Sequence, residues 1–309
     1  MNQFNTPILF LIFNRPDTTK QVFERIKEVK PKFLFIAADG ARENKIDEKK
    51  LCNQTREIVI DNIDWPCEVK TLIRTQNLGC GKAVSEAITW FFDNVEMGII
   101  LEDDCLPEID FFYFCNELLK KYRFNEKIYS IGGTNVLLNW KDDNQSYHFS
   151  YQGSIWGWAT WKRAWNKYQF ILPATLNDKA IKTLKEISFN SAYFKIRKDI
   201  FEKVKNIDTW DYQWAYTRLS NKGLSILPSK NLITNIGFGT NATHTTDDEH
   251  KLAQLKSFQL NKPLKHLDKI KLDKKFEKKF LNFLYSQPKE NNKLNKAKAL
   301  YTQLKSLYK

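Results

Sequence analysis

The chain has 309 residues, of which 42% are hydrophobic and 28% are charged, as in a globular protein with a sizeable core. No apolar run approaches the roughly 18 residues of a membrane-spanning helix. The five cysteines contain no CxxC pair, so neither a disulfide framework nor a zinc site is indicated. We therefore expect a cytoplasmic protein.

The net charge of +13 is distributed very unevenly. Residues 251–309 contain 16 Lys and no Arg against four acidic residues, a net charge of +12, so that residues 1–250 carry only +1. A basic segment of this kind suits an anionic membrane surface, nucleic acid or simple solubility. Because base-specific contacts favour bidentate Arg, the absence of Arg argues against a nucleic-acid partner.

Two amphipathic helices are expected within the basic segment. Phe276, Phe280, Phe283 and Leu284 follow helical spacing, and a second apolar face runs through Ala297, Leu300, Leu304 and Leu307. Two interpretations carry equal weight. The helices either pack on the main domain with their lysines in solvent, or bind at the inner face of a membrane as a peripheral contact.

Strands and helices alternate over the first 105 residues. Apolar or alternating runs predict strands at 8–13, 33–38, 68–73 and 98–101, and the intervening segments have helical spacing. Four such units predict a parallel sheet with right-handed crossovers and a ligand crevice at the carboxyl ends of its strands. The residues expected there are Asn14, Arg15, Asp39, 74–81 and 102–104.

The second half of the chain is less regular. A helix is expected from Phe111 to Tyr122, followed by a strand at 128–131. Residues 132–245 are rich in Trp and Gly without a clear period, and we expect the substrate-specific part of the protein there.

Three consecutive acids, Glu102, Asp103 and Asp104, are the sharpest chemical feature. They directly follow a buried strand, where crowded carboxylates are unfavourable unless a cation compensates them. Hard oxygen ligands of this kind suit Mn²⁺ or Mg²⁺. The alternative is an acidic turn that caps the helix beginning near Asp110.

The segment Gly79–Lys82 looks superficially like a phosphate loop. It fails the GxxxxGK[ST] pattern and also the dinucleotide fingerprint, so both motifs are rejected. Lys82 itself remains a candidate for nucleotide-sugar binding.

Other candidates are weaker when taken singly. Trp158 beside Gly157 could stack on a sugar ring or belong to the core. Asp211, set between Trp210 and Tyr212, could be a general base, since a half-apolar site raises a carboxyl pKa. His244 could be a metal or phosphate ligand or a structural histidine.

Taken in order, these residues resemble a GT-A fold inverting glycosyltransferase of the N-acetylglucosaminyltransferase I type, and related bacterial glycosyltransferases. The likeness rests on an Arg after the first strand, an Asp after the second, and the acidic triplet leading into Asp110-Phe111-Phe112. Gly157-Trp158, Trp210-Asp211 and Phe238-Gly239…His244 follow in the same order. The likeness covers residues 7–246, so a GT-A domain is expected over 1–250, with a Lys-rich helical extension over 251–309.

The resemblance implies a role for each matching residue. Asp104 would ligate a divalent metal that bridges the donor diphosphate, with His244 near the metal. Asp103 would approach the ribose and Glu102 the transferred sugar. Asp39 would recognise uracil and Arg15 the nucleotide. Asp211 would be the general base, although Tyr212 stands where the eukaryotic pattern has a second acid.

The expected activity is transfer of a hexosyl or N-acetylhexosaminyl group from a UDP-sugar to a hydroxyl of a glycan or lipid-linked glycan, in bacterial surface polysaccharide or glycoconjugate synthesis. A sugar-1-phosphate nucleotidyltransferase shares the sheet and the metal chemistry. That class would have a Gly-rich loop after the first strand, where this chain has Asn14-Arg15-Pro16. A non-catalytic scaffold that binds RNA or membrane through its basic segment is the third interpretation.

Overall fold

The computed structural model describes residues 3–173, 176–204, 207–238 and 255–285. In the first half of the chain, strands and helices alternate in the order β1 (Ile8–Ile12), α1 (Pro16–Val29), β2 (Phe33–Ala38), α2 (Glu48–Ile60), β3 (Glu68–Ile73), α3 (Gly79–Asn94) and β4 (Met97–Glu102). All four expected strands are present, and their ends lie within a residue or two of the predicted positions.

The local sequence explains this alternation. Every residue of β1 is buried, as in a parallel strand covered on both faces. Helix α1 begins at Pro16, whose fixed φ and missing N–H suit the first helical turn. One apolar stripe of α1, which includes Val22, Phe23 and Ile26, faces the sheet and is buried.

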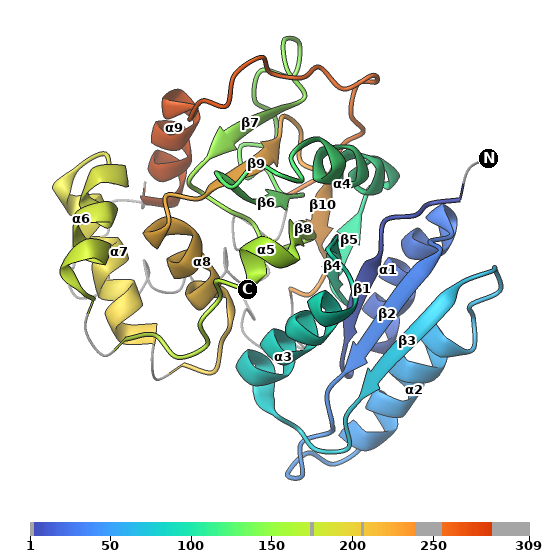
Figure 1. Cartoon of the computed structure of the whole chain (residues 1–309). Helices are drawn as coiled ribbons and strands as arrows, with labels where there is room; N and C mark the ends of the chain where they lie inside the picture. Colours follow the sequence, from blue (N-terminus) through green and yellow to red (C-terminus); the bar gives the residue numbers. More distant parts are fainter. Residues whose placement is uncertain (1–2, 174–175, 205–206, 239–254, 286–309) are drawn as a thin grey trace.

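Eight strands form one sheet in the order β3-β2-β1-β4-β8-β6-β9-β7. The pairs β1–β2, β2–β3 and β1–β4 are parallel, so the carboxyl ends of these four strands lie at the same edge. Helices α1 and α2 lie together on one face of this part of the sheet and α3 lies on the other (Figure 1). The arrangement is a Rossmann-like mixed α/β fold, as the sequence predicted.

The second half of the chain adds further strands, in both parallel and antiparallel pairs, and further helices. Its elements are β5 (Cys105–Pro107), α4 (Ile109–Lys121), β6 (Ile128–Gly132), β7 (Tyr147–Ser150), β8 (Trp158–Trp161), α5 (Lys162–Trp165), β9 (Leu224–Pro228) and β10 (Ile233–Asn235). Strand β8 enters the sheet between β4 and β6 and is antiparallel to both. Strand β10 pairs with β5, which brings residues 233–235 against the segment that follows the acidic triplet.

Three helices form a smaller cluster beside the sheet: α6 (Asp178–Ile187), α7 (Ser191–Lys203) and α8 (Asp211–Ser220) (Figure 1). They share an apolar core of their own that includes Leu184, Phe201 and Leu219. The loop that enters α8 returns to the main sheet and reaches the amino end of α3.

The described part of the basic segment packs on the main domain through α9 (Lys274–Tyr285). Phe276 and Phe280 are buried, and the Phe276 ring lies 5.7 Å from the Trp140 ring, centroid to centroid. These two phenylalanines are therefore unavailable to a lipid surface, which corrects the membrane-facing interpretation of this helix. The second expected helix, with Ala297 and Leu300, lies outside the described residues. Among the helices that are described, none is both long and apolar enough to cross a membrane.

Candidate active site

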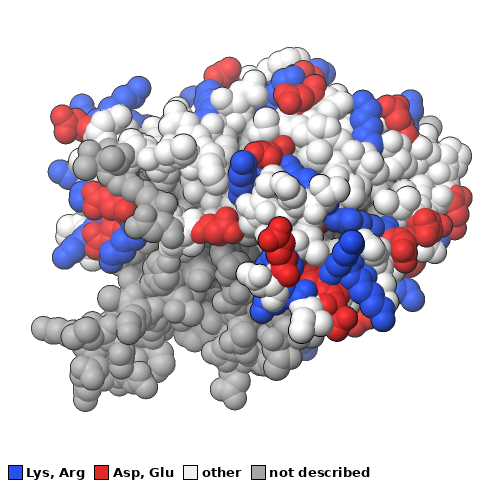
Figure 2. Space-filling model, turned by 90° about the horizontal axis from the view of Figure 1, so that it is seen from below, with Lys and Arg blue, Asp and Glu red and all other residues white. Residues whose placement is uncertain are grey.

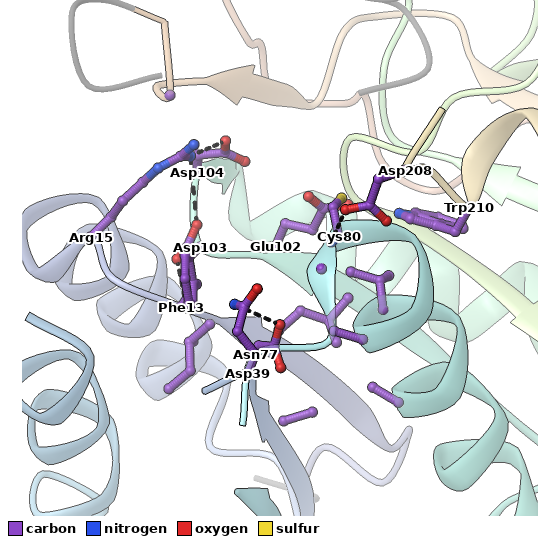
Figure 3. A pocket seen from close by; sticks show the side chains of 18 of the residues that line it. Phe13, Arg15, Asp39, Asn77, Cys80, Glu102, Asp103, Asp104, Asp208 and Trp210 are labelled. Atoms are coloured by element: carbon purple, nitrogen blue, oxygen red, sulfur yellow. Dashed lines mark hydrogen bonds and ion pairs between the residues drawn. The ribbon is translucent and has the colours of Figure 1, made fainter. Parts of the chain in front are cut away.

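A cavity of about 450 Å³ opens at the carboxyl ends of β1, β2 and β4. Arg15, Asp39, residues of the 74–81 segment and the acidic triplet line it, as predicted for the crevice (Figure 3). Asn14, which was also expected there, instead donates its side-chain amide to Glu48 and does not line the cavity. The opposite wall comes from the loop before α8 and from the residues after β10. Acidic and basic side chains are interspersed on the face of the molecule where β1–β3 end (Figure 2).

Arg15 and the last two acids of the triplet form one cluster. Nη1 of Arg15 lies 2.6 Å from Asp104 Oδ2 and 3.8 Å from Asp103 Oδ1. The backbone N–H of Phe13 donates to Asp103 Oδ2 at 3.0 Å. Burial alone would lower the pKa of Arg15, but Asp104 and Asp103 outweigh it and raise that pKa. The guanidinium therefore stays charged and holds the β1 and β4 ends together.

Glu102 is the least compensated of the three acids. In the part of the chain that the structure describes, its carboxylate has no hydrogen bond or ion pair. Burial, followed by the negative charges of Asp104 and Asp103, raises the pKa of Glu102 to about 8. Burial and Asp104 likewise raise the pKa of Asp103 to about 7, against the opposing charge of Arg15. One arginine thus does not neutralise three carboxylates.

These residues fit a divalent cation that is shared with a ligand. The excess negative charge and the hard oxygen donors favour Mg²⁺ or Mn²⁺. Among the described residues, no group of three His, Cys, Asp or Glu side chains forms a complete metal site. Mg²⁺ commonly binds through one or two carboxylates together with substrate phosphates. Asp104, with Asp103 beside it, can provide that partial set.

Asp39 organises the turn between β3 and α3. Its carboxylate accepts the backbone N–H groups of Gly40 at 2.9 Å and Leu78 at 3.1 Å, and the side-chain amide of Asn77 at 3.0 Å. Burial raises the pKa of Asp39 although these hydrogen bonds oppose it. Both oxygens are thus engaged with the turn, while the side chain also lines the cavity.

Arg42 is a cavity residue that the sequence analysis missed. Its side chain forms an ion pair with the buried carboxylate of Glu48, and its guanidinium carbon lies 5.5 Å from the centre of the Phe13 ring. With Arg15 and Arg74 it gives the cavity three arginines. The sequence signal that could have identified Arg42 was a basic residue three positions after Asp39, close to the end of the second strand.

Asp208 is the second residue that was missed. It lines the cavity and accepts the backbone N–H groups of Cys80 at 2.9 Å and Gly81 at 2.8 Å. A Cβ at Gly79 would lie 2.4 Å from Asp208 Oδ2, and one at Gly81 would lie 2.8 Å from Oδ1. The two glycines therefore allow this carboxylate to approach the first turn of α3.

The structure places Asp211 behind the cavity wall. It is 1% exposed and does not line the cavity, and its Oδ1 accepts the Thr209 hydroxyl. A general base must come within hydrogen-bond reach of the proton that it takes. Helix α8 begins at Asp211 and its side chain is buried there, so the expected role of Asp211 as general base stays a prediction.

The structure describes three of the four remaining candidates. The Lys82 side chain is 56% exposed and lies 3.8 Å from Glu86 on the outer face of α3, away from the cavity lining. Trp158 is fully buried in β8 and stacks on Trp210 at 5.7 Å, so it belongs to the core and does not face a sugar. Gly157, at φ +60°, packs against Ile233 and is a structural turn. His244 lies outside the described residues.

Comparisons with known proteins leave the activity open. No protein-family model matches the chain, and no curated protein sequence is similar to it. Among similar solved structures, UDP-glucose pyrophosphorylase in complex with UDP-glucose has 9% identity and a TM-score of 0.37, over 74% of this chain and 93% of that one. HddC from Yersinia pseudotuberculosis has 12% identity and a TM-score of 0.31, over 51% and 77%. Similarity this low assigns no activity to this chain.

Proposed function

We propose that this protein is a metal-dependent inverting glycosyltransferase. It takes a sugar from a nucleoside diphosphate, UDP in the first instance, and transfers it to a hydroxyl group of a glycan or lipid-linked glycan. The proposal rests on one observation above all: the acidic triplet faces three arginines in a cavity at the carboxyl ends of parallel strands. Crevices at that edge are the usual ligand sites of such sheets.

The cavity has three ends that match the three parts of a nucleotide sugar (Figure 3). Asn77 and the Phe13–Arg42 pair offer an amide and a flat surface to a nucleobase, beside the turn that Asp39 organises. Arg15 and Asp104 stand at the diphosphate end. Glu102 and Trp210 stand at the third end, where a carboxyl group and an aromatic ring suit a sugar.

The residues of this chain can support a single displacement at the anomeric carbon. A divalent cation held by Asp104 would supply charge neutralisation to the departing diphosphate. Arg15 adds a fixed positive charge at the same end of the cavity, where charge accumulates in the transition state. Attack by the acceptor oxygen from the opposite face inverts the anomeric configuration.

The first test is the coupling between nucleotide and metal. We expect UDP to raise the melting temperature only when Mn²⁺ or Mg²⁺ is present, because Asp104 and the diphosphate share the cation. Asp104→Asn should abolish the joint effect. Asp64→Asn, which changes an exposed carboxylate paired with Lys27, is the matched control and should leave it intact. Equal UDP shifts with and without metal in the wild-type protein would contradict the proposal.

The products distinguish this activity from nucleotidyl transfer. A glycosyltransferase releases UDP from a UDP-sugar, whereas a sugar-1-phosphate nucleotidyltransferase consumes or forms pyrophosphate. The loop after β1 reads Asn14-Arg15-Pro16 and contains no glycine, which favours the former. Pyrophosphate-dependent UTP formation from a UDP-sugar would replace the proposal with the second activity.

A further inference from the structure

We propose that Asp208 is the general base of the reaction. The inference rests on the proposed function and assigns the acceptor end of the same cavity. Asp208 lines the cavity from the loop before α8, whereas the triplet lines it from the end of β4. Figure 3 shows the Asp208 side chain beside Trp210 and Cys80, at the end of the cavity where Glu102, the first acid of the triplet, also lies. An acceptor hydroxyl that enters at this end meets the Asp208 carboxylate.

The position of this carboxylate is fixed from two sides. The N–H groups of Cys80 and Gly81 each donate to one of its oxygens. In the loop that leads into α8, Asp208 is followed by Thr209 and Trp210, which are both buried. A carboxylate oxygen that accepts one hydrogen bond keeps a second lone pair. Asp208 can therefore accept an acceptor hydroxyl without releasing α3.

The segment Gly79–Lys82 now has a physical explanation. Although the segment fails the phosphate-loop pattern, its backbone amides do bind an anion, which is the carboxylate of Asp208 in the same chain. The close approach of Asp208 to Gly79 and Gly81 leaves no room for a Cβ at either position. These glycines therefore serve to position Asp208 in the cavity and do not cradle a phosphate.

Neither of the two nearby acids is as well placed. Asp211 is buried and outside the cavity lining. Glu102 lines the cavity, but it ends β4 on the same wall as Asp103 and Asp104, beside the carboxylate that would hold the cation and the donor diphosphate. Asp208 comes from the loop before α8 on the opposite wall, where an acceptor can approach the donor from its other side.

The proposed step is balanced within the enzyme–substrate complex. The acceptor oxygen forms a bond to the anomeric carbon as the bond from that carbon to the diphosphate oxygen breaks, and the bonding electron pair leaves with the diphosphate. The hydroxyl proton passes to an oxygen of Asp208. With water as the acceptor, the same step hydrolyses the UDP-sugar.

The experiment measures UDP release from UDP-glucose and UDP-N-acetylglucosamine with Mn²⁺, using water as the acceptor. We expect Asp208→Asn to lower kcat by about 10²-fold or more, since general bases contribute on that order. Its KM for the donor should stay within about 3-fold of the wild-type value, because Asp208 does not hold the nucleotide. Asp64→Asn, which changes an exposed carboxylate paired with Lys27, is the matched control and should keep kcat within the same 3-fold margin. Asp211→Asn is measured beside it, and circular dichroism confirms the fold of all three variants.

The alternative outcomes separate the two proposals. A parallel loss of kcat and donor affinity in Asp208→Asn would show that Asp208 only caps α3, and would overturn the inference. Wild-type turnover in Asp208→Asn together with a large loss in Asp211→Asn would return the role to Asp211. If the wild-type protein binds UDP with metal but releases no UDP from either donor, the proposed function itself fails, and the structural role of Asp208 is all that remains.

Discussion

Three neighbouring carboxylates differ sharply in their surroundings. Asp104 is paired with Arg15, Asp103 accepts a backbone N–H, and Glu102 has neither kind of partner among the described residues. Glu102 ends β4, and Asp103 and Asp104 follow it in the turn to β5. All three line the cavity, but Asp103 is only 7% exposed. The site therefore contains one paired acid and one acid under electrostatic strain.

The strain on Glu102 predicts a pH-dependent stability. The pKa of Glu102 rises from 4.5 in the unfolded chain to about 8 in the folded protein. Since the folded state then holds the extra proton, this group stabilises the protein below pH 4.5, and the effect is lost as the pH rises through 8. We expect Glu102→Gln to melt a few °C higher than the wild-type protein at pH 9 and equally at pH 4.5. About 1 kcal/mol corresponds to roughly 2–4 °C for a chain of this size.

The measurement is a thermal melt in EDTA across this pH range. Addition of Mn²⁺ and UDP at pH 9 should narrow the difference, because a cation held by Asp104 in both proteins offsets the charge of Glu102, which only the wild-type protein carries. A Glu102→Gln variant that is less stable than wild type at every pH would show that Glu102 forms favourable contacts in the folded state.

Two helices are fixed by carboxylates that come from distant parts of the chain. Asp208 caps the first turn of α3, and Glu277 anchors α9 to the end of β7. The Glu277 carboxylate is fully buried and accepts the Ser150 hydroxyl, the Tyr151 backbone N–H at 2.6 Å and the Gln152 side-chain amide at 2.8 Å. Each such contact closes a long loop, so each has a large effect on how the elements pack.

The anchor of α9 can be tested by removing its acceptor. Glu277→Ala leaves several buried donors without a partner, and each unmade hydrogen bond costs about 1–3 kcal/mol. We expect a loss of at least 2 kcal/mol in the free energy of unfolding, measured by urea denaturation. Lys278→Ala, on the exposed face of the same helix, should change it by less than about 0.5 kcal/mol. Similar losses in both variants would mean that α9 is held by its phenylalanines alone.

At the scale of the whole molecule, apolar side chains of the basic segment are part of the core of the main domain. Leu255, Leu260, Phe276 and Phe280 belong to the same apolar cluster as the central sheet. Replacing one buried Phe by Ala typically costs about 3–5 kcal/mol, against a total stability of about 5–15 kcal/mol. We therefore expect a chain that ends at His250 to lose its cooperative thermal transition in circular dichroism. A truncated chain that melts cooperatively and still binds UDP would establish an independent domain.

The lysines of α9 remain exposed although its phenylalanines are buried. We infer that any membrane contact of this helix is electrostatic, through Lys274, Lys275 and Lys278. A lysine near an anionic leaflet contributes about 1 kcal/mol. Changing all three to Gln should lower the affinity for phosphatidylglycerol vesicles at low salt by about 10²-fold, as measured by co-sedimentation. Wild-type binding that is equal on phosphatidylcholine vesicles would contradict the electrostatic account.

A matched variant tests whether position matters in addition to charge. Changing the exposed Lys20, Lys45 and Lys49 to Gln removes the same charge from the α1–α2 side of the molecule. This variant should retain most of the vesicle binding, because a lysine contributes only within about a Debye length of the surface. An equal loss in both variants would indicate attraction by net charge alone.

The sequence by itself determined the first half of the fold and the acidic end of the site. Strands such as 33–38 and helices such as α1 follow from local apolar patterns, and parallel order follows from their alternation. Because the carboxyl ends of parallel strands meet at one edge, Arg15, Asp39 and Glu102 could be placed in one crevice before any contact was known.

Only the tertiary structure decided the opposite wall of the cavity. Asp208 meets Cys80 across 128 residues of sequence, and no local pattern encodes a contact of that range. Trp158 illustrates the same limit: its neighbours leave open whether it lies in a loop or a strand, and its burial comes from β8 pairing with β4 and β6. The position of Asp211 depends on the same kind of information, because the direction of its side chain is set by where α8 starts against the sheet.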